Sequence, residues 1–179
     1  MSIGLAAKPE VFILDVDGVM TDGTFFYSAE GKVFKMFGAD DHDVLSLLAG
    51  HLDIRFVTGD RRGFGISRKR IEEDMKMPLD LVSTSRRTEW IAERYPLDRV
   101  IYMGDGVFDV LVFEKVGYSI AAANALPQTA SAADFVTSRA GGDRAVAEAG
   151  FHILSAFFGL KTVEEMVRHT DKASGFWAV

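Results

Sequence analysis

Short runs of apolar residues recur along the chain, and most of them end at a small or polar residue. Runs of this kind are typical of strands that are buried on both faces, as in a parallel sheet. We predict five such strands, at 11–14, 53–58, 79–83, 100–104 and 118–121.

Between these runs the apolar positions follow a helical spacing. In residues 41–50 they share one face behind acidic residues, and Gly50 is a stop signal. Similar patterns predict helices within 87–96 and 108–117, and a long closing helix within 141–159. Strands and helices that alternate in this way indicate right-handed crossovers and a three-layer α/β sandwich with a mostly parallel sheet.

One segment interrupts the alternation. Residues 24–37 form two β-rich runs around Glu30 and Gly31, which predicts a β-hairpin inserted directly after the first strand. Residues 169–179 lack helical periodicity and are expected to form an extended tail. The sequence contains no repeat and no linker, so we expect a single domain over residues 1–179, without a separate cap domain.

Composition narrows the possible functions. A length of 179 residues suits one domain with a sizeable core. A net charge of -6 argues against nucleic acid as the main partner. The absence of cysteine excludes disulfides, thiolate nucleophiles and cysteine metal sites, and it fits a reducing compartment. No apolar stretch reaches the ~18 residues that a membrane helix needs, so we expect a cytoplasmic protein without membrane contact.

Two acids close the first predicted strand. Asp15 and Asp17 are separated by one residue, and carboxylates so close repel unless a cation holds them. Mg²⁺ prefers such oxygen ligands, and Asp105 and Asp109 can supply further carboxylates after a later strand. Ligands of open α/β sheets bind beyond the carboxyl ends of the strands, so this pattern indicates a phosphoryl-transfer site. The alternative is that "DVDG" forms only a turn after a strand.

Three motifs carry a resemblance to a known family. The stretches "DVDGVMTDG", "VTGD" and "GDGVFD" resemble motifs one, two and four of the haloacid dehalogenase (HAD) superfamily, in the right order and each at a strand end. The hairpin and the later "GGDRAVAEA" resemble, more narrowly, phosphatases of the Kdo-8-phosphate phosphatase type, which act on sugar acids made for bacterial surface polysaccharides. The likeness runs from about Val11 to Leu154 and implies a Rossmann-like sheet.

The resemblance implies a role for each acid. Asp15 would be the nucleophile that forms an aspartyl-phosphate, and also a Mg²⁺ ligand. Asp17 would protonate the leaving oxygen and then activate water, while its backbone carbonyl ligates Mg²⁺. Asp105 would bind the metal directly, with Asp109 supporting it from behind.

The phosphate contacts depart from the family pattern at one point. Thr58 would hydrogen-bond the phosphate, as in the family. The third motif should contain a lysine, but the chain offers Arg86 and Arg87, and alignment against "RTEWI" favours Arg87. A guanidinium keeps the charge and can grip phosphate in a bidentate way. The alternative is that both arginines are solvated at a helix start. Lys69, the nearby lysine, lies in an apparent helix and is a poor candidate.

The substrate-binding residues are less clearly marked. The family usually carries Arg-Asp-Gly after the hairpin, whereas this chain keeps only the acid, as Asp41, between Asp40 and His42. We expect Asp41 and His42 to contact the substrate, although Asp40 or Asp41 could simply cap the next helix. Gly59, Arg61 and Arg86 complete the expected substrate contacts.

Two functions from different classes remain. The first is a Mg²⁺-dependent phosphomonoesterase that acts on a small phosphorylated sugar or sugar acid of the Kdo-8-phosphate or acylneuraminate-9-phosphate type. The second is a non-catalytic assembly or regulatory domain with the same fold, associated with sugar-nucleotide synthesis. Retention of Asp17 favours the enzyme, because a proton-handling acid serves a leaving group and a water. The resemblance also implies a homotetramer in which the hairpins associate and each subunit helps to cover a neighbouring pocket.

Overall fold

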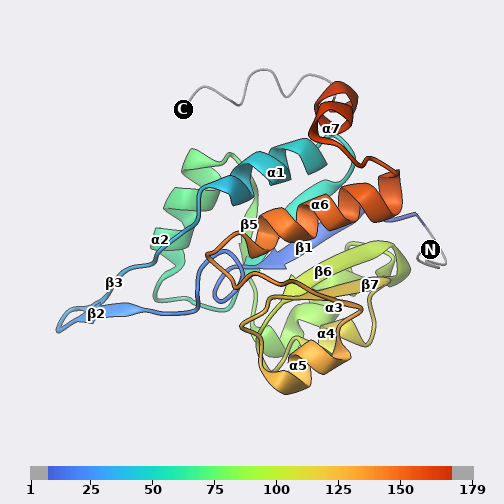
Figure 1. The fold of residues 1–179 in the computed structure, drawn as a ribbon. Coiled ribbons are helices and arrows are strands. Elements are labelled where there is room, and N and C mark those ends of the chain that lie inside the picture. The colour runs from blue at the N-terminus through green and yellow to red at the C-terminus, as the bar shows by residue number, and fades with distance from the viewer. Residues whose placement is uncertain (1–7, 171–179) are drawn as a thin grey trace.

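The computed structural model describes residues 8–170, which contain a six-stranded parallel sheet (Figure 1). The strand order is β5-β4-β1-β6-β7-β8. The strands are β1 Val11–Asp15, β4 Asp53–Thr58, β5 Leu79–Leu81, β6 Val100–Gly104, β7 Tyr118–Ala121 and β8 Phe135–Val136. All five predicted strands are confirmed. The sixth, β8, has only two residues, which is too short to give an apolar run.

Helices cover both faces of the sheet. Helices α1 and α6 pack together on one face, and α3, α4 and α5 lie on the other (Figure 1). This arrangement confirms the predicted three-layer α/β sandwich. The helices are α1 Asp40–Leu48, α2 Phe64–Arg68, α3 Arg87–Ala92, α4 Val110–Phe113, α5 Pro127–Ala132, α6 Ala145–Phe158 and α7 Val163–His169, and a π-helical turn, Lys69–Asp74, extends α2.

Side chains of the central strand alternate between two cores. Phe12 and Leu14 of β1 pack in the core beneath α1 and α6, whereas Val11 and Ile13 pack in the core beneath α3 and α4. All four side chains are fully buried. Each contributes about 1.5–3 kcal/mol by leaving water, and together they fix the end of β1 in the middle of the sheet.

The hairpin is confirmed and projects from the body of the molecule (Figure 1). Strands β2 Phe26–Ser28 and β3 Gly31–Phe34 pair in antiparallel fashion, with an irregularity after Phe26. The rings of Phe26 and Phe34 stack with centroids 4.2 Å apart, yet both remain 40% or more exposed. The paired region is shorter than the predicted 24–37 because the chain after β3 turns back into the body.

Two helices of the second half were not predicted. Helix α5 begins with Pro127 at its first turn, and α7 is capped by Thr162 and Glu165, each side chain accepting from the other residue's backbone N–H. The expected extended tail lies outside the described residues from position 171 onward. Within residues 8–170 no helix is both long and apolar enough to cross a bilayer.

Candidate active site

The candidate site lies where the strand order reverses. Strand β1 has β4 on one side and β6 on the other, so the connections on its two sides run in opposite directions from its carboxyl end. Crevices of this kind bind ligands in open α/β sheets. A pocket of about 520 Å³ opens here, and its walls include Asp15, Asp17, Gly59, Arg61, Arg87 and Asp105. The structure therefore brings together residues that the sequence placed at four separate strand or helix ends.

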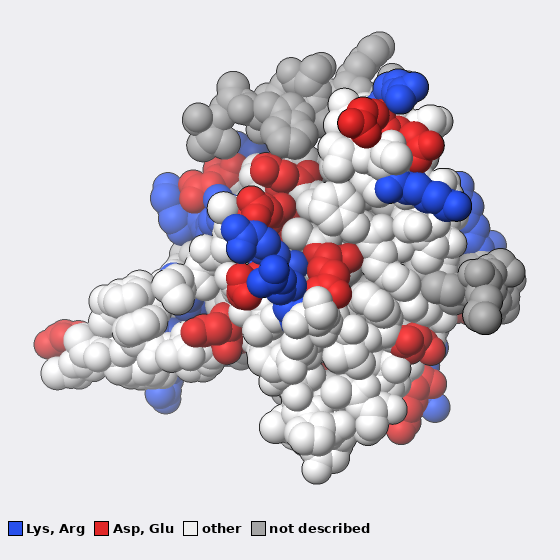
Figure 2. Space-filling view, in the orientation of Figure 1, with Lys and Arg blue, Asp and Glu red and all other residues white. Residues whose placement is uncertain are grey.

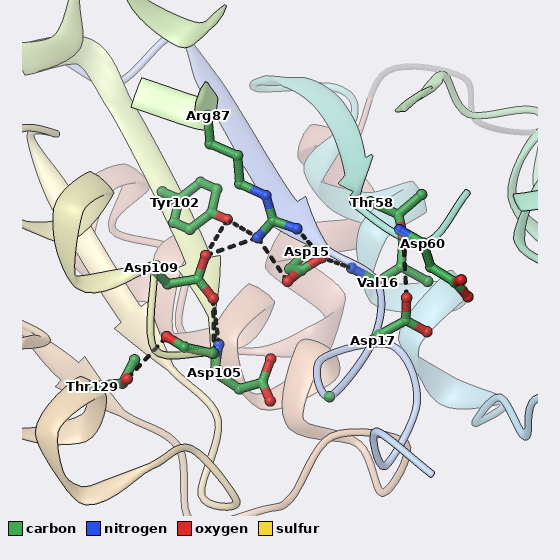
Figure 3. Close-up of polar contacts among 12 residues, drawn as sticks. Asp15, Val16, Asp17, Thr58, Asp60, Arg87, Tyr102, Asp105, Asp109 and Thr129 are labelled. Atoms are coloured by element: carbon green, nitrogen blue, oxygen red, sulfur yellow. Dashed lines mark hydrogen bonds and ion pairs between the residues drawn. The ribbon is translucent and has the colours of Figure 1, made fainter. Parts of the chain in front are cut away.

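Arg87 grips Asp15 with both terminal nitrogens (Figure 3). Its Nη1 donates to Asp15 Oδ2 at 2.7 Å and its Nη2 donates to Oδ1 at 2.8 Å. Burial raises the pKa of Asp15 to about 6, and the Arg87 charge opposes that rise. Arg87 is itself buried, at 1% exposure, so this is an interior ion pair rather than a surface one.

Asp109 and Tyr102 hold Arg87 from behind. Arg87 Nη1 also donates to Asp109 Oδ1 and to the Tyr102 hydroxyl, each at 2.8 Å, and Tyr102 donates to Asp109 Oδ1 at 2.7 Å. The other oxygen of Asp109 accepts from the backbone N–H groups of Asp105 and Gly106. With both oxygens engaged in this way, Asp109 acts as a support for its neighbours more than as a free ligand.

Asp105 differs from Asp109 in how its carboxylate oxygens are engaged. Its Oδ1 is buried without a hydrogen-bond partner among the described residues. Burial raises its pKa to about 8, with further contributions from the negative charges of Asp15 and Asp109. Oxygens of these three acids lie within 4.8 Å of one another, and a cation placed among them would remove the repulsion. The oxygen-only donor set suits Mg²⁺, so the residues fit the expected metal.

Gly18 leaves room for the Asp105 carboxylate at the site. Gly18 has φ +92°, in the left-handed region that favours glycine, and a Cβ built there would lie 2.0 Å from Asp105 Oδ2. Any larger residue would collide with the Asp105 carboxylate. The Gly in "DVDG" thus has a steric reason beyond the turn itself.

Asp17 and Thr58 form a second pair at the pocket. The Thr58 hydroxyl donates to Asp17 Oδ2 at 3.1 Å and accepts from the backbone N–H of Asp60 (Figure 3). Thr58 is fully buried, and Asp17, not Thr58, is among the residues that line the pocket. The expected hydrogen bond from Thr58 to phosphate therefore requires this hydroxyl to leave Asp17.

Three expected substrate-binding residues are not among those that line the pocket. Arg86 points outward and pairs with Glu89, while His42 and Asp41 lie in α1. Asp41 is fully buried and its Oδ1 accepts from the backbone N–H of Ala147, at the start of α6. The interpretation that Asp40 or Asp41 caps its own helix is wrong, because α1 has no side-chain cap and Asp41 instead serves α6.

Comparisons with known proteins identify the family of the chain. A model of the haloacid dehalogenase-like hydrolase family matches residues 90–149. The chain is 32% identical over 153 residues to the 3-deoxy-D-manno-octulosonate 8-phosphate phosphatase KdsC of Salmonella typhi, a match that covers 80% of this chain and 78% of the relative. The chain belongs to the Kdo-8-phosphate phosphatase family of haloacid dehalogenase-like hydrolases. It is a phosphatase.

Solved structures of this phosphatase family have the same fold. The cobalt-bound phosphatase from Haemophilus influenzae aligns with a TM-score of 0.77 at 27% identity, over 89% of this chain and 97% of that one. The phosphatase from Moraxella catarrhalis, in complex with magnesium, phosphate and Kdo, aligns with a TM-score of 0.71 at 25% identity, over 84% and 88% of the two chains. These matches confirm the predicted family and fold class.

Three residues of this phosphatase site were missed in the sequence. Tyr102 lies in the middle of a fully buried strand, and a buried hydroxyl needs a partner, which was a usable signal. Asp60 follows Thr58 and Gly59 directly, but Lys35 belongs to the hairpin segment, and nothing in the sequence indicates that it contacts Asp17 and Asp60. Burial alone would raise the pKa of Asp60, but ion pairs with Lys32 and Lys35 lower it to about 2.

Proposed function

We propose that this phosphatase is a Mg²⁺-dependent enzyme that hydrolyses a phosphorylated sugar acid through an aspartyl-phosphate on Asp15. One observation carries the proposal: the Asp15 carboxylate faces the pocket beside a buried Arg87 and within 4.8 Å of two further carboxylates. A nucleophile, a fixed cation and a place for a metal are the parts that phosphoryl transfer requires.

In the first step an oxygen of Asp15 attacks phosphorus and the bond between phosphorus and the sugar oxygen breaks. The electron pair of that bond stays on the sugar oxygen, which takes a proton from Asp17 and leaves as an alcohol. In the second step Asp17, now ionised, accepts a proton from a water that attacks the aspartyl-phosphate. Inorganic phosphate leaves and Asp15 is restored.

The metal would be held by Asp15, Asp105 and the backbone carbonyl of Asp17, with Asp109 orienting its neighbours through its four hydrogen bonds. When bound, Mg²⁺ would neutralise negative charge on the phosphate. Arg87 supplies a second positive charge from a position that its contacts with Tyr102 and Asp109 hold fixed. Fixed charges of this kind need no reorganisation during the reaction, which is the source of their effect on rate.

The substrate class rests on the relatives. The matched proteins are named for 3-deoxy-D-manno-octulosonate 8-phosphate, a 2-keto sugar acid with a primary phosphate. Arg61 and Gly59 line the pocket and are our candidates for contacts with the sugar. The chain carries Asp40 where the family usually carries an arginine, and Asp40 pairs with Arg144. An acid at this position argues against the usual sugar acid of the family, so we propose the sugar-acid class and use a substrate panel to identify the sugar.

The hairpin supports a homotetramer. Figure 2 shows the projecting hairpin covered largely by uncharged side chains, and Phe26, Tyr27, Val33 and Phe34 are among its exposed apolar residues. A cluster of exposed apolar side chains on a small protein marks an interaction site. A neighbour that packs on this hairpin would also shield a pocket that the chain, on its own, leaves open to water.

The direct test is release of inorganic phosphate from a substrate panel with Mg²⁺. The panel comprises Kdo-8-phosphate, an acylneuraminate-9-phosphate and a neutral hexose phosphate. We expect the highest kcat/KM on a keto acid and loss of activity with EDTA that Mg²⁺ restores. Preference for the neutral sugar would refute the substrate class, and full activity in EDTA would refute the metal.

A further inference from the structure

Lys35 lies outside the predicted set of site residues, yet it contacts one of the predicted catalytic acids. It follows β3 directly, where the hairpin returns to the body, and its side chain is fully buried. Its Nζ lies 2.6 Å from Asp17 Oδ1 and 2.9 Å from Asp60 Oδ2, and it donates to the Ser67 hydroxyl at 2.9 Å. The hairpin thus delivers a cation to the carboxylate that the proposed function makes the proton donor.

Lys32 provides an internal comparison. Its Nζ also pairs with Asp60 and lies 3.3 Å from the centre of the Phe25 ring. Lys32 forms no ion pair with Asp17 in the described part of the chain. The two lysines share burial, segment and one acidic partner, and they differ in whether they contact Asp17.

Gly63 gives the lysines room to approach. A Cβ at this position would lie 2.2 Å from Asp60 Oδ2, 2.8 Å from Lys32 Cδ and 2.9 Å from Lys35 Cε. Gly63 also donates its backbone N–H to Asp60 Oδ1 at 3.0 Å. The loop after β4 is therefore shaped around the two lysines.

The two oxygens of Asp17 have separate partners. Thr58 donates a hydrogen bond to Oδ2, and Lys35 holds Oδ1 through an ion pair that lacks hydrogen-bond geometry. Together these contacts fix where the carboxyl group lies. Asp17 needs such a fixed position because proton transfer requires the donor within hydrogen-bond reach of the leaving oxygen.

We propose that Lys35 is a positioning residue for Asp17, through which the docked hairpin sets the geometry of proton transfer to the leaving group. The inference rests on the proposed role of Asp17. Lys35 itself acts on Asp17 and needs no contact with phosphate. Its loss should therefore matter most for substrates whose leaving group needs a proton.

The test compares kcat/KM on a sugar phosphate with kcat/KM on p-nitrophenyl phosphate, whose leaving group needs little protonation. Lys35→Met should lose at least about tenfold more activity on the sugar phosphate than on the aryl ester. Lys32→Met, the matched control, should lose similar factors on both. Lys35→Arg should recover part of the lost activity on the sugar phosphate, because it keeps a cation near Asp17.

A double variant separates positioning from a merely structural role. If Lys35 acts through Asp17, adding Lys35→Met to Asp17→Asn should lower kcat/KM by less than about threefold further. If the losses of kcat/KM in the two single variants instead multiply in the double variant, the proposal is overturned. Should Lys35→Met fail to fold by circular dichroism, Ser67→Ala removes one contact of Lys35 and should shift the selectivity in the same direction to a smaller extent; unchanged selectivity there would also overturn it.

The same data separate this proposal from the proposed function. If Asp17→Asn loses equally on both esters, Asp17 is not the proton donor and that step of the proposed function fails. If Asp17→Asn discriminates between the esters but Lys35→Met does not, only the role of Lys35 fails.

Discussion

The guanidinium of Arg87 and the carboxylate of Asp15 form a bidentate pair inside the protein, with contacts of 2.7 and 2.8 Å. The same guanidinium contacts Asp109, so one buried cation serves two carboxylates, one at the end of β1 and one at the start of α4. Removing it would leave both acids without their partner in a site where charges are costly to bury. This relationship supports the proposal that Arg87 replaces the lysine of the third motif.

We expect Arg87→Ala to lower kcat by on the order of 10²-fold or more, as is usual when a fixed group that stabilises the transition state is removed. Arg87→Lys keeps the charge but not the bidentate geometry and should retain more activity. Arg86→Ala is the matched control, because Arg86 is exposed and pairs only with Glu89 among the described residues. Phosphate release from a saturating substrate measures all three, and a larger loss for Arg86→Ala would transfer the role to Arg86.

Asp17→Asn tests whether Asp17 is the proton donor while Asp15 is the nucleophile. We expect a large loss of kcat/KM on an alkyl phosphate and a smaller one on p-nitrophenyl phosphate, since an amide cannot give the leaving oxygen its proton. Circular dichroism should show an intact fold. Equal losses on the two esters would remove Asp17 from the role of acid.

The acidic cluster predicts that the metal-free protein becomes less stable as the pH rises. The pKa of Asp105 is about 8 in the fold against 3.8 for the free side chain, so between these values the folded state binds more protons than the unfolded state. The metal-free protein should therefore lose stability through this group as the pH rises from about 4 to 8. Each 1 kcal/mol lost corresponds to about 2–4 °C in Tm at this chain length.

Mg²⁺ should reverse this trend, because it binds the ionised acids. The increase in Tm on adding Mg²⁺ should be larger at pH 8 than at pH 5.5. Asp105→Asn should raise the Tm of the metal-free protein at pH 8 and abolish the response to Mg²⁺. A response to Mg²⁺ that is the same in Asp105→Asn as in the wild type would exclude Asp105 as a ligand.

The exposed hairpin predicts an assembly. Light scattering should give a mass about four times that of the 19.7 kDa chain. Phe26→Asp with Phe34→Asp places charge on the stacked pair and should dissociate the oligomer and lower activity, without touching Lys32 or Lys35. Val163→Asp, at an exposed apolar position of α7 far from the hairpin (Figure 1), is the control. A fully active monomer would refute the shared cover of the pocket.

The parallel sheet could be predicted because both of its faces are buried. Strands such as β1 and β6 are then almost entirely apolar, and an acid marks the carboxyl end of each, which placed Asp15 and Asp105 at one edge of the sheet. Short elements with weak patterns, such as β8 and α5, give no comparable signal.

The contacts of the hairpin lysines could not be predicted for a different reason. Strand alternation describes which residues share a face of the hairpin, but not where the hairpin docks on the body. Lys35 and Asp60 are 25 positions apart and meet only through the fold. Asp41 illustrates the same limit, because its position at the start of α1 suggested a cap there, while its partner is Ala147 of α6.

The most direct test of the account is the covalent state of Asp15. Wild-type enzyme and Asp15→Asn are quenched in acid during turnover of a phosphorylated sugar acid with Mg²⁺, and the peptide that contains residue 15 is examined by mass spectrometry. The account predicts one added phosphoryl group on the wild-type peptide, none on the variant, and no phosphate release by a correctly folded Asp15→Asn. Phosphate release by the variant at the wild-type rate, or a phosphoryl group on another residue, would contradict it.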